Sequence, residues 1–576
     1  MDRSTGTRCQ YEHWWKRRTS PSSNKHHQEK EQSTLALPLP TFPPALDFDP
    51  DQFLLPPSYE EVIDLEKALH LVPSRRSSSN DVSALCTSSA APNPLLCKFR
   101  TQQEHLSSSP SRCIRVIRHL RFAIFTVYRR FFTLVFVLNL IGVAILLQQH
   151  SNNLKTILDL DTLGTFASSN FLLAIFVRQD CFVNLLFRTA WLVPWSLPLR
   201  IRTMMSRVYC YGGIHSGAAV VGTLWWLIFT GVMSWTCITK GSHTFPVIII
   251  TWVVCLLLMT VVLLAFPSIR TKHHDTFEMT HRFLGWTSIG LFWAQLLLLS
   301  QEKSALSNST ETIGSILLRN PTFWNLSIMT LLLIYPWLRL RRWNFTARAL
   351  SSHALQLSFP NKVHKFSCLS ISSAPLYEWH PFATFPSLDP NEPGASMVIS
   401  DAGDWTKNVI QHAQMRNSVH QIITKSQLGT TKELPRESTV QMRFWVKSHP
   451  KAGVLSLSCL FPRVLIVTTG SGIGPSLSSL LDRPPSQFAR LIWSTRSPLT
   501  TFGPRILSLV DKADSDALIL DTSEMGRPNL LEVAWKMMIE VRAEAVFVLS
   551  NEAVTKAVVG GLEKRGVRAF GPIWDS

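Results

Sequence analysis

The chain has 576 residues, of which 46% are hydrophobic and only 17% are charged, and it includes 19 Trp and 32 Phe. This composition is richer in large apolar side chains than that of a typical soluble protein. The formal net charge of +18 at pH 7 comes from Arg and Lys that flank apolar runs instead of interleaving with aromatic residues. We therefore expect a membrane surface as partner and no nucleic acid.

The ten cysteines include no CxxC pair and no paired spacing. A zinc site, an iron–sulfur cluster and a disulfide framework all lack support, so reduced thiols are expected. No apolar signal-peptide segment opens the sequence, which predicts that the first membrane helix directs insertion.

Residues 1–110 are rich in Ser, Pro, Gln, Lys and His. Such a composition buries too little apolar surface to offset the entropy of ordering, so this basic region is predicted to be disordered. Inside it, Pro56, Pro57 and Tyr59 form a PPxY motif. Proline-rich extended peptides of this kind bind aromatic grooves such as those of WW domains, which makes a WW-domain protein a candidate partner. Chance occurrence of the short motif is the alternative.

Residues 111–345 are predicted to form a multi-pass α-helical membrane domain. Six apolar segments approach the length that crosses a bilayer, at about residues 131–147, 163–177, 213–238, 245–266, 283–299 and 322–338. Residues 181–199 are also apolar but are interrupted by Arg188, Pro194 and Pro198. We interpret that run as an interfacial segment, which leaves six spans.

Positive residues cluster before the first span, between the second and third, between the fourth and fifth, and after the sixth. The positive-inside tendency then places these four regions and both termini in the cytosol. The sequon at Asn308 falls in a loop that faces outward in this orientation. The chain is expected to be an integral protein of the plasma membrane or an endomembrane.

The last third of the sequence changes pattern twice. Residues 346–460 contain short alternating stretches separated by Pro and Gly, as in an antiparallel β-barrel. From residue 461 to 576, apolar β-branched runs alternate with helical patterns, which predicts a parallel α/β domain.

A glycine-rich turn follows the first strand of this α/β domain and contains Gly470, Gly472, Gly474 and Pro475. Glycines let the backbone approach a pyrophosphate closely, and the free N–H groups of the following helix attract negative charge. Pro475 fits the first turn of that helix. An ordinary glycine turn is the alternative interpretation of this cluster.

Four motifs in this order resemble the ferric reductase and NADPH oxidase superfamily, with its ferredoxin-reductase-type FAD and NAD(P) domains. They are YEWHPFATF at residues 377–385, GDWTK at 403–407, TTGSGIGP at 468–475 and LIWSTR at 491–496. With HRFLGW, RFWVKSHPKAGVL and GPIWDS, the sequence is most similar to a fungal family of integral membrane flavoproteins related to that superfamily.

The resemblance implies that FAD binds in the barrel domain and a nicotinamide nucleotide in the α/β domain. The implied flavin contacts are His380, Pro381, Phe382, Gly403, Trp405 and Thr406. For His380 alone, a buried histidine at a strand end is the alternative. Arg496 at the end of the second strand favours NADPH over NADH, because Arg accommodates a 2′-phosphate. A merely solvated arginine would leave NADH possible.

The implied function is a membrane-bound oxidoreductase that passes hydride from NADPH to FAD on the cytosolic side. Two departures weaken that transfer. Ala383 stands where relatives have Ser or Thr, which loses a hydroxyl contact unless Thr384 supplies it, and residues 549–552 read LSNE where many relatives have Cys-Gly. The alternative is a redox-sensing or signalling protein with a degenerate reductase module and a PPxY recruitment motif.

In relatives a terminal aromatic residue covers the flavin, which points to Trp574 or Phe570, with a core position as the alternative for both. Full members also hold two haems between histidines of the third and fifth spans. Here His215 and His281 form one pair near the inner face, whereas Phe229, Ala294 and Gln295 occupy the second positions. We therefore expect at most one haem; the alternative is that both histidines are structural.

Overall fold

The computed structural model describes residues 126–149, 158–306, 312–388, 394–428, 439–447 and 450–573. All of these residues belong to one compact unit of the chain, Lys67–Ser576. The predicted disordered region, the PPxY motif, Asn308 and Trp574 lie outside the described residues.

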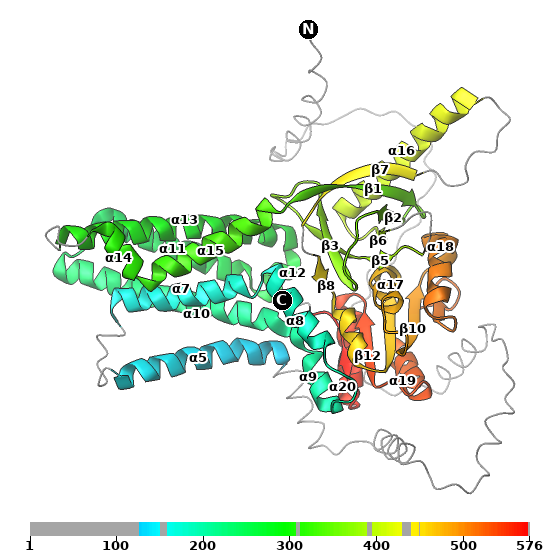
Figure 1. Ribbon diagram of the computed structural model, residues 1–576, viewed down its shortest axis with the longest axis horizontal. Helices are drawn as coiled ribbons and strands as arrows, with labels where there is room; N and C mark the ends of the chain where they lie inside the picture. Colours follow the sequence, from blue (N-terminus) through cyan, green and yellow to red (C-terminus); the bar gives the residue numbers. More distant parts are fainter. Residues whose placement is uncertain are drawn as a thin grey trace, which may run out of the picture. The chain divides into compact units, whose positions relative to one another are not determined.

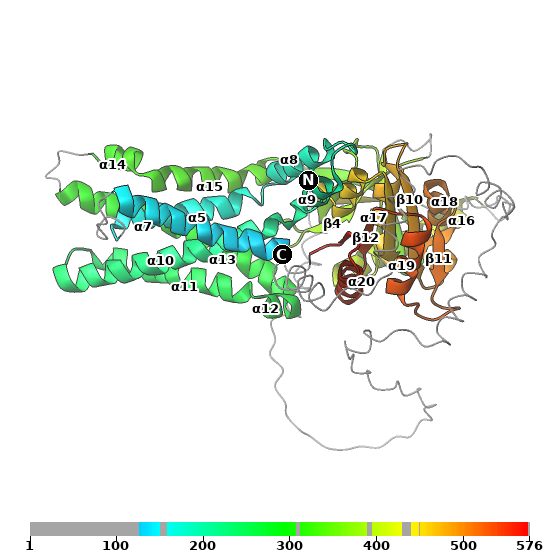
Figure 2. The ribbon, with the colours of Figure 1, turned by 90° about the horizontal axis from the view of Figure 1, so that it is seen from below.

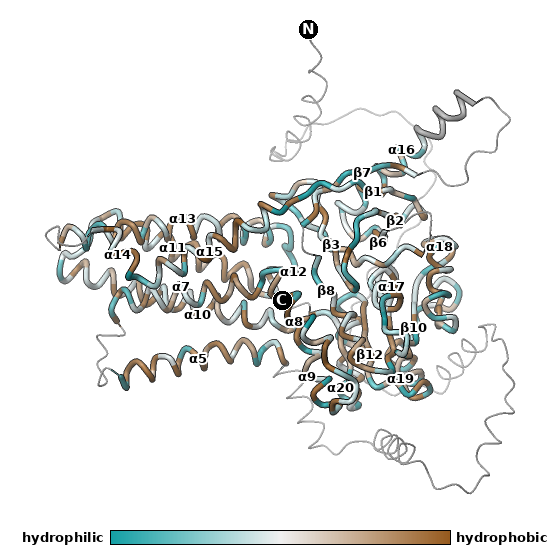
Figure 3. The backbone as a smooth tube through the Cα atoms, viewed as in Figure 1, coloured by the Kyte–Doolittle hydropathy of each residue, from teal (hydrophilic) through white to brown (hydrophobic). Residues whose placement is uncertain are grey.

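All six apolar segments form helices, which run largely alongside one another (Figures 1 and 2). Their bounds are α5 Val127–Gln149, α7 Leu160–Phe176, α10 Gly212–Lys240, α11 Phe245–Leu264, α13 His274–Leu306 and α15 Pro321–Leu338. Short helices α12 (Pro267–Lys272) and α14 (Ile313–Arg319) lie between them. Apolar residues predominate along α5 and α11 (Figure 3).

The predicted number of six spans is not confirmed. Among the described residues, four helices are long and apolar enough to cross a membrane: α5, α11, α13 and the stretch Val208–Lys240 that contains α10. Helix α7 and the following α8 (Asp180–Trp191) are bent by 63° and would count as a fifth span if taken together. Helix α15 is not among them; its 18 residues include Asn325 and the internal Pro336.

Small residues allow α5 and α10 to pack closely. A Cβ at Gly217 would lie 2.8 Å from the carbonyl oxygen of Phe132, and one at Gly213 would collide with that of Tyr128. The Tyr128 hydroxyl also hydrogen-bonds Ser216 Oγ at 2.5 Å. Glycine at a helix–helix contact lets the two backbones approach closely. This is a common way for helices to associate in lipid, where no hydrophobic effect drives them together.

The connection between α7 and α10 packs on the α/β domain. It comprises α8, α9 (Leu199–Met205) and the short helix η4 (Val208–Tyr211), and we call residues 180–211 the α8–η4 segment. Val183, Phe187 and Ala190 of α8 belong to the same buried core as the strands of the α/β domain. The sequence predicted an interfacial segment here, because a helix that is apolar on one face reads the same way whether lipid or protein covers it.

Two arginines, one buried and one half-buried, fix the α8–η4 segment to that domain. Arg202, 5% exposed, pairs with Glu544 at 2.7 Å and donates to the carbonyl of Leu460. Arg207 pairs with Glu563 at 2.5 Å, and its guanidinium lies 4.6 Å from the ring centroid of Phe570.

In the described residues, the predicted antiparallel domain has eight strands in the order β4-β3-β7-β1-β2-β6-β5, with β8 paired to β3. The strands are β1 Arg341–Ala349, β2 Ala354–Phe359, β3 Ser367–Ser372, β4 His380–Ala383, β5 Phe385–Pro386, β6 Ala395–Ser400, β7 Thr439–Val446 and β8 Lys451–Ala452. All their pairings are antiparallel. Helix α16 (Asp404–Leu428) leaves this sheet after β6 and packs Val409, Ile410 and Ala413 against its core.

The predicted parallel α/β domain is confirmed. Its five strands have the order β11-β10-β9-β12-β13, and they are β9 Arg463–Thr469, β10 Phe488–Thr495, β11 Leu518–Asp521, β12 Ala545–Leu549 and β13 Ala569–Phe570. Helices α17 (Ile473–Leu481), α18 (Pro498–Ala513), α19 (Leu530–Glu540) and α20 (Glu552–Lys564) connect them, and the short helix η5 (Val454–Leu460) precedes β9. The strand order reverses at β9, where ligands of such sheets commonly bind.

Candidate functional site

The glycine-rich turn lies at this reversal point, as the short helix η6 (Gly470–Gly472) between β9 and α17. Gly470 has a φ of 48°, and a Cβ added to it would meet nothing within 4 Å. Its carbonyl accepts a hydrogen bond from Trp493 Nε1 at 3.0 Å. The turn is thus held by its carbonyl while the Cα of Gly470 faces open space, which suits close approach by a ligand.

Gly472 and Gly474 have different roles from the one predicted. A Cβ at Gly472 would collide with Thr468 Oγ1 and lie 2.9 Å from the carbonyl oxygen of Leu549. A Cβ at Gly474 would lie 3.7 Å from Val398 Cβ. The missing side chain of Gly472 therefore makes room for protein, a Cβ at Gly474 would only contact Val398 in the ordinary way, and of the three glycines only Gly470 leaves space open.

Hydroxyl groups join the carboxyl ends of the two central strands beside the turn. Thr468 Oγ1 donates to the carbonyl of Leu549 at 2.9 Å, and the hydroxyls of Thr469 and Ser550 are 2.6 Å apart. Thr469 and Ser550 lie in the quoted stretches TTGSGIGP and LSNE, but the contact between them was not predicted. The sequence signal for this contact was a hydroxyl-bearing residue at the end of each of two strands, β9 and β12, that pair in the usual parallel order.

Arg496 directly follows β10, where its side chain is exposed. Ser497 next to it has a φ of 42°, and its N–H donates to Asp521 Oδ1 at 2.9 Å. The Thr501 hydroxyl donates to the carbonyl of Arg496. The backbone at the end of β10 is therefore fixed, and the guanidinium is free to meet a ligand at the same strand edge as Gly470.

Two motifs from the antiparallel domain meet in one aromatic cluster. The ring of His380 on β4 stacks on Trp405 of α16, with centroids 4.0 Å apart and planes at 19°. Phe382 on the same strand lies 6.1 Å from Trp405 at 25°. Pro381 between them is exposed. This arrangement offers nearly parallel aromatic faces, which is the surface that a flat heterocycle would stack on.

His380 has an unused polar atom in this cluster. Its Nε2 is buried and makes no hydrogen bond, although it lies 3.5 Å from Glu378 Oε2. A buried polar atom without a partner is uncommon and calls for an explanation. An isoalloxazine ring, which carries both carbonyl oxygens and ring nitrogens, would supply one, so this side chain fits a flavin.

Thr384 does not replace the hydroxyl that Ala383 lacks. It is 2% exposed, and its Oγ1 donates to the carbonyl of Ser367 at 3.1 Å. The backbone N–H of Thr384 donates to the same carbonyl. Thr384 lies between β4 and β5, and its side chain points inward. The predicted contact between Thr384 and the flavin is therefore wrong.

Gly403 and Thr406 form the start of α16. Thr406 Oγ1 accepts hydrogen bonds from the N–H groups of Ala402 and Gly403 at 3.0 and 3.1 Å. Thr406 Oγ1 does not accept from the N–H groups of the helical residues that follow Gly403. Such N–H groups at the start of a helix attract negative charge. Thr406 thus shapes a turn that can receive a phosphate group, and its own oxygen is occupied in doing so.

The two halves of the site adjoin. Helix α17 contacts β4, β5 and β6 of the antiparallel domain. Gly474 approaches Val398 of β6, and Asp482 Oδ2 accepts the N–H of Phe366 at 2.9 Å. The glycine turn and the strand that carries His380 are consequently held side by side.

Lys447 and Arg282, which sequence reasoning missed, flank the loop before β4. The ammonium of Lys447 lies 4.7 Å from the ring centroid of Trp379, and burial, assisted by the charge of Lys451, lowers the pKa of Lys447 to about 8. Arg282 Nη1 donates to the carbonyl of Leu376 at 2.6 Å. Arg282 lies in the motif HRFLGW and Lys447 in RFWVKSHPKAGVL, but neither motif indicates this contact, because the fold brings the two distant segments to the loop.

The predicted histidine pair is brought together. The rings of His215 and His281 have centroids 6.2 Å apart. His215 Nδ1 lies 2.9 Å from the carbonyl of Ala174, and His281 Nδ1 is buried without a partner. No group of three or more His, Cys, Asp or Glu that could hold a metal ion occurs in the described parts of the chain. Haem ligation by this pair stays a prediction.

Phe570 is a core residue. It is fully buried on β13 and stacks on Phe547, with centroids 4.9 Å apart. Of the two aromatic residues considered as flavin covers, Trp574 therefore stays as a prediction outside the described residues, and Phe570 is excluded because protein packs against its ring.

Comparisons with known proteins point to reductases. Adenylate-forming reductase 06235 from Coprinopsis cinerea is 36% identical over 465 residues, which is 80% of this chain and 41% of the relative. Adenylate-forming reductase 03009 from the same organism is 34% identical over 466 residues, again 80% and 41%. The chain thus spans less than half the length of these curated relatives.

Solved structures that resemble parts of the chain include two flavoproteins. A ferredoxin–NADP+ reductase from Neisseria gonorrhoeae with bound FAD and NADP is 13% identical, with a TM-score of 0.28, and covers 41% of this chain and 98% of its own. A flavohemoglobin from Malassezia yamatoensis with bound FAD and haem is 14% identical, with a TM-score of 0.31, and covers 72% of this chain and 99% of its own.

Residues 454–576 match the family model described as the C-terminal domain of adenylate-forming reductase 03009.

Proposed function

We propose that this protein is a membrane-bound NAD(P)H-dependent flavoprotein oxidoreductase in which hydride passes from NADPH to FAD on the cytosolic side. The observation that carries the proposal is the contact of α17, which follows the glycine turn, with β4 to β6 of the antiparallel domain. Hydride transfer needs the nicotinamide and the flavin stacked, so their two sites must adjoin in this way.

Four residues would hold the FAD. His380, Phe382 and Trp405 present the aromatic surface and the unused Nε2. Gly403, at the start of α16, leaves open space next to the free N–H groups of the helix. When bound, FAD supplies an acceptor for hydride; the protein orients its ring and keeps it beside the second site.

The nicotinamide nucleotide would bind along the carboxyl edge of the parallel sheet. Gly470 gives the backbone of the turn close access to a pyrophosphate at the start of α17. The exposed Arg496 suits the 2′-phosphate of NADPH, although NADH stays possible if the guanidinium is only solvated. Thr469 and Ser550 stand at the strand ends where the nicotinamide would approach.

The membrane part of the proposal rests on the long apolar helices and on the distribution of Arg and Lys. The same charges support cytosolic termini. The relation to membrane ferric reductases and NADPH oxidases, a single haem between His215 and His281, and a WW-domain partner for the PPxY motif belong to this proposal as well.

A second candidate function is redox sensing without rapid turnover. It is favoured by the inward-facing hydroxyl of Thr384 and by Ala383, which leave the flavin strand without a hydroxyl contact. Ser550 also stands where a cysteine is expected beside the hydride path. In this case nucleotide binding would report the redox state and a partner would read it.

An absorbance spectrum of the full chain in detergent, recorded before and after NADPH, tests the proposal. We expect a flavin spectrum that bleaches rapidly with NADPH. Trp405→Ala should release the flavin, whereas Trp535→Ala, on α19 of the neighbouring domain, should retain it. Slow bleaching with bound flavin would favour sensing, and a colourless folded protein would refute both forms of the proposal.

A further inference from the structure

The glycine turn is held from behind by a side chain that is buried away from any ligand. Trp493 on β10 is fully buried, and its Nε1 donates to the carbonyl of Gly470 at 3.0 Å. The proposed function assigns contacts with the nucleotide to Gly470 and Arg496 and none to Trp493. This tryptophan therefore stands where it can influence nucleotide binding only through the turn.

Gly470 alone does not fix the direction of the peptide bond that follows it. Its φ of 48° lies in the left-handed region, but glycine adopts positive and negative φ about equally readily. A rotation of this peptide would turn the carbonyl oxygen of Gly470 toward the open side of the turn, where it would repel a phosphate. A second group must hold the carbonyl inward, and the Trp493 indole does so.

The same hydrogen bond sets the direction of the next N–H group. A trans peptide is planar, so the carbonyl of Gly470 and the N–H of Ser471 point in opposite directions. Because the carbonyl points to the indole, the Ser471 N–H points away from it, and Ser471 is exposed. The Gly470 carbonyl also accepts the N–H of Ile473, which closes the turn before α17. Backbone N–H groups at such a helix start bind anions.

The indole is itself fixed by its neighbours. Trp493 pairs with Thr468 of β9 on one side and with Ile519 of β11 on the other. The ring of Phe502 on α18 meets the Trp493 ring edge to face, with centroids 5.2 Å apart and planes at 64°. A donor held in this way keeps its acceptor, the Gly470 carbonyl, in one position.

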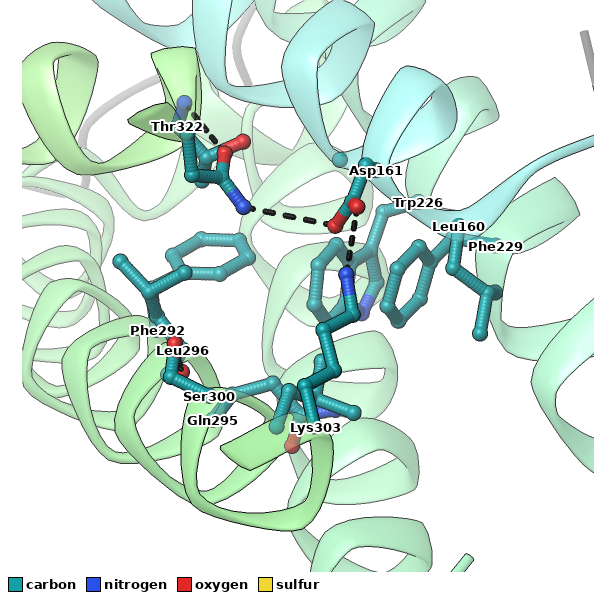
Figure 4. A pocket seen from close by; sticks show the side chains of 13 residues that line it. Leu160, Asp161, Trp226, Phe229, Phe292, Gln295, Leu296, Ser300, Lys303 and Thr322 are labelled. Atoms are coloured by element: carbon teal, nitrogen blue, oxygen red, sulfur yellow. Dashed lines mark hydrogen bonds and ion pairs between the residues drawn. The ribbon is translucent and has the colours of Figure 1, made fainter. Parts of the chain in front are cut away.

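A pocket among the helices shows the opposite arrangement (Figure 4). Trp226 and Phe229, which line it, stack on each other with centroids 4.6 Å apart, and Asp161 pairs with Lys303. Its accessible volume is about 40 Å³, against about 150 Å³ for a cavity that holds benzene. This pocket is too small for an organic ligand, whereas the turn combines open space in front of Gly470 with a fixed donor behind it.

We propose that Trp493 positions the turn for the pyrophosphate of the nicotinamide nucleotide. Its indole N–H holds the Gly470 carbonyl inward, so that the Ser471 N–H meets the phosphate without rearrangement of the backbone. Trp493 is a positioning residue, because it acts through the turn and does not touch the ligand. This role rests on the proposed function, and it gives β10 two tasks in binding, with Trp493 behind the turn and Arg496 after the end of the strand.

Trp493→Phe tests this role, because it removes the N–H and keeps an aromatic ring. In calorimetric titration of the full chain in detergent, we expect the Kd for NADP+ to rise about fivefold for the loss of one net hydrogen bond. The NADPH concentration that gives half-maximal bleaching of the flavin should rise equally, at an unchanged maximal rate. Bleaching by 1-benzyl-1,4-dihydronicotinamide, a hydride donor without phosphate, should be as fast as in the wild type.

Leu491→Ala is the matched control. Leu491 is fully buried two residues before Trp493 on the same face of β10, and its truncation opens a cavity without removing a hydrogen-bond donor. We expect lower stability with an unchanged Kd for NADP+. If Trp493→Phe fails to fold, Trp493→3-benzothienylalanine replaces the indole N–H with sulfur in a ring system of nearly the same size.

An unchanged Kd for NADP+ in the Trp493 variant, or an equal rise in Leu491→Ala, would overturn the proposal. Slower bleaching with the phosphate-free donor would overturn it too, because the effect would then lie on the flavin or on hydride transfer. Wild-type protein that bleaches with the phosphate-free donor but not with NADPH would refute the proposed function as well. The two failures are therefore distinguishable.

Discussion

Two contacts between the helices and the reductase module are built differently. The α8–η4 segment is part of the core of the parallel domain, with Arg202 buried and Arg207 half-buried in ion pairs. The start of α13 contacts the loop before β4 through Arg282 and the carbonyl of Leu376. The first contact removes charge and apolar surface from water, whereas the second consists of one hydrogen bond to a loop and a ring contact between Phe283 and Tyr377.

The difference assigns different roles to the two contacts. Breaking a buried ion pair leaves an uncompensated charge inside the protein, so the parallel domain depends on the α8–η4 segment for its stability. A hydrogen bond to one carbonyl contributes much less. The α8–η4 segment therefore holds the module more firmly than the start of α13 does, and it also reaches the antiparallel domain, where Asp180 of α8 pairs with Lys451 of β8 at 2.8 Å.

Breaking the stronger contact should have the largest effect. Arg202→Ala is expected to lower the free energy of unfolding by about 3–5 kcal/mol, because Glu544 would stay partly buried without its partner. Urea unfolding of the detergent-solubilised chain, followed by tryptophan fluorescence, measures it. Arg200→Ala on the same helix removes an exposed arginine and serves as control; equal losses in both variants would contradict a structural role for the buried pair.

A substitution in the glycine turn tests the rigidity of the parallel domain. Gly472→Ala should destabilise the chain by about 1–3 kcal/mol, as overpacking does, because its Cβ meets Thr468 and the Leu549 carbonyl. It should also reduce NADPH-driven bleaching, since the turn would shift. Gly403→Ala, where a Cβ meets nothing within 4 Å, is the matched change on the flavin side. An unchanged melting temperature for Gly472→Ala would disprove the tight fit.

The flavin side should respond to pH through Lys447. Burial lowers its pKa to about 8 from the ordinary 10.5, so between these values the unfolded chain binds more protons than the folded chain. The free energy of unfolding therefore rises with pH from about 8 to 10.5, and below pH 8 the folded state bears the full cost of the buried charge.

Lys447→Met should remove this pH dependence and raise the melting temperature at pH 7 by a few degrees. Thermal unfolding at pH 7, 8 and 9 measures both effects, with the exposed Lys407 changed to Met as control. A pH dependence that persists in Lys447→Met would assign it to another group.

The weaker contact should give the smallest effect. Arg282→Ala is expected to change the free energy of unfolding by about 1 kcal/mol and to leave the flavin bound. Parallel measurements of stability and flavin content check this. A loss as large as that of Arg202→Ala would erase the distinction between the two contacts.

Part of this architecture could be predicted from the sequence. Apolar runs predict the long helices, and the strand–turn–helix pattern around Gly470 predicts the parallel domain, because these signals lie in single stretches. The grouping of His380, Phe382 and Trp405 came from motif resemblance; their stacking needs the fold that brings β4 to α16.

Other features depend on contacts between distant residues. Helix α8 carries the same apolar face whether lipid or the parallel domain covers it. Thr384 turns inward because of strand direction, which no motif specifies. The predicted six spans were not confirmed, since α15 combines a length of only 18 residues with an internal proline. The orientation of the Gln295 amide likewise depends on a distant residue, because its Nε2 donates to Thr251 on another helix.

The ion pair between Arg202 and Glu544 joins residues separated by 342 positions. A ribosome that adds about 5–20 residues each second makes the second residue roughly 17–70 s after the first. During that interval, α8 has left the ribosome with an apolar face and a neighbouring arginine, while the domain that covers them does not yet exist. The nascent chain must therefore be shielded from aggregation until its last strands are synthesised, and the parallel domain completes the folding of a segment made long before it.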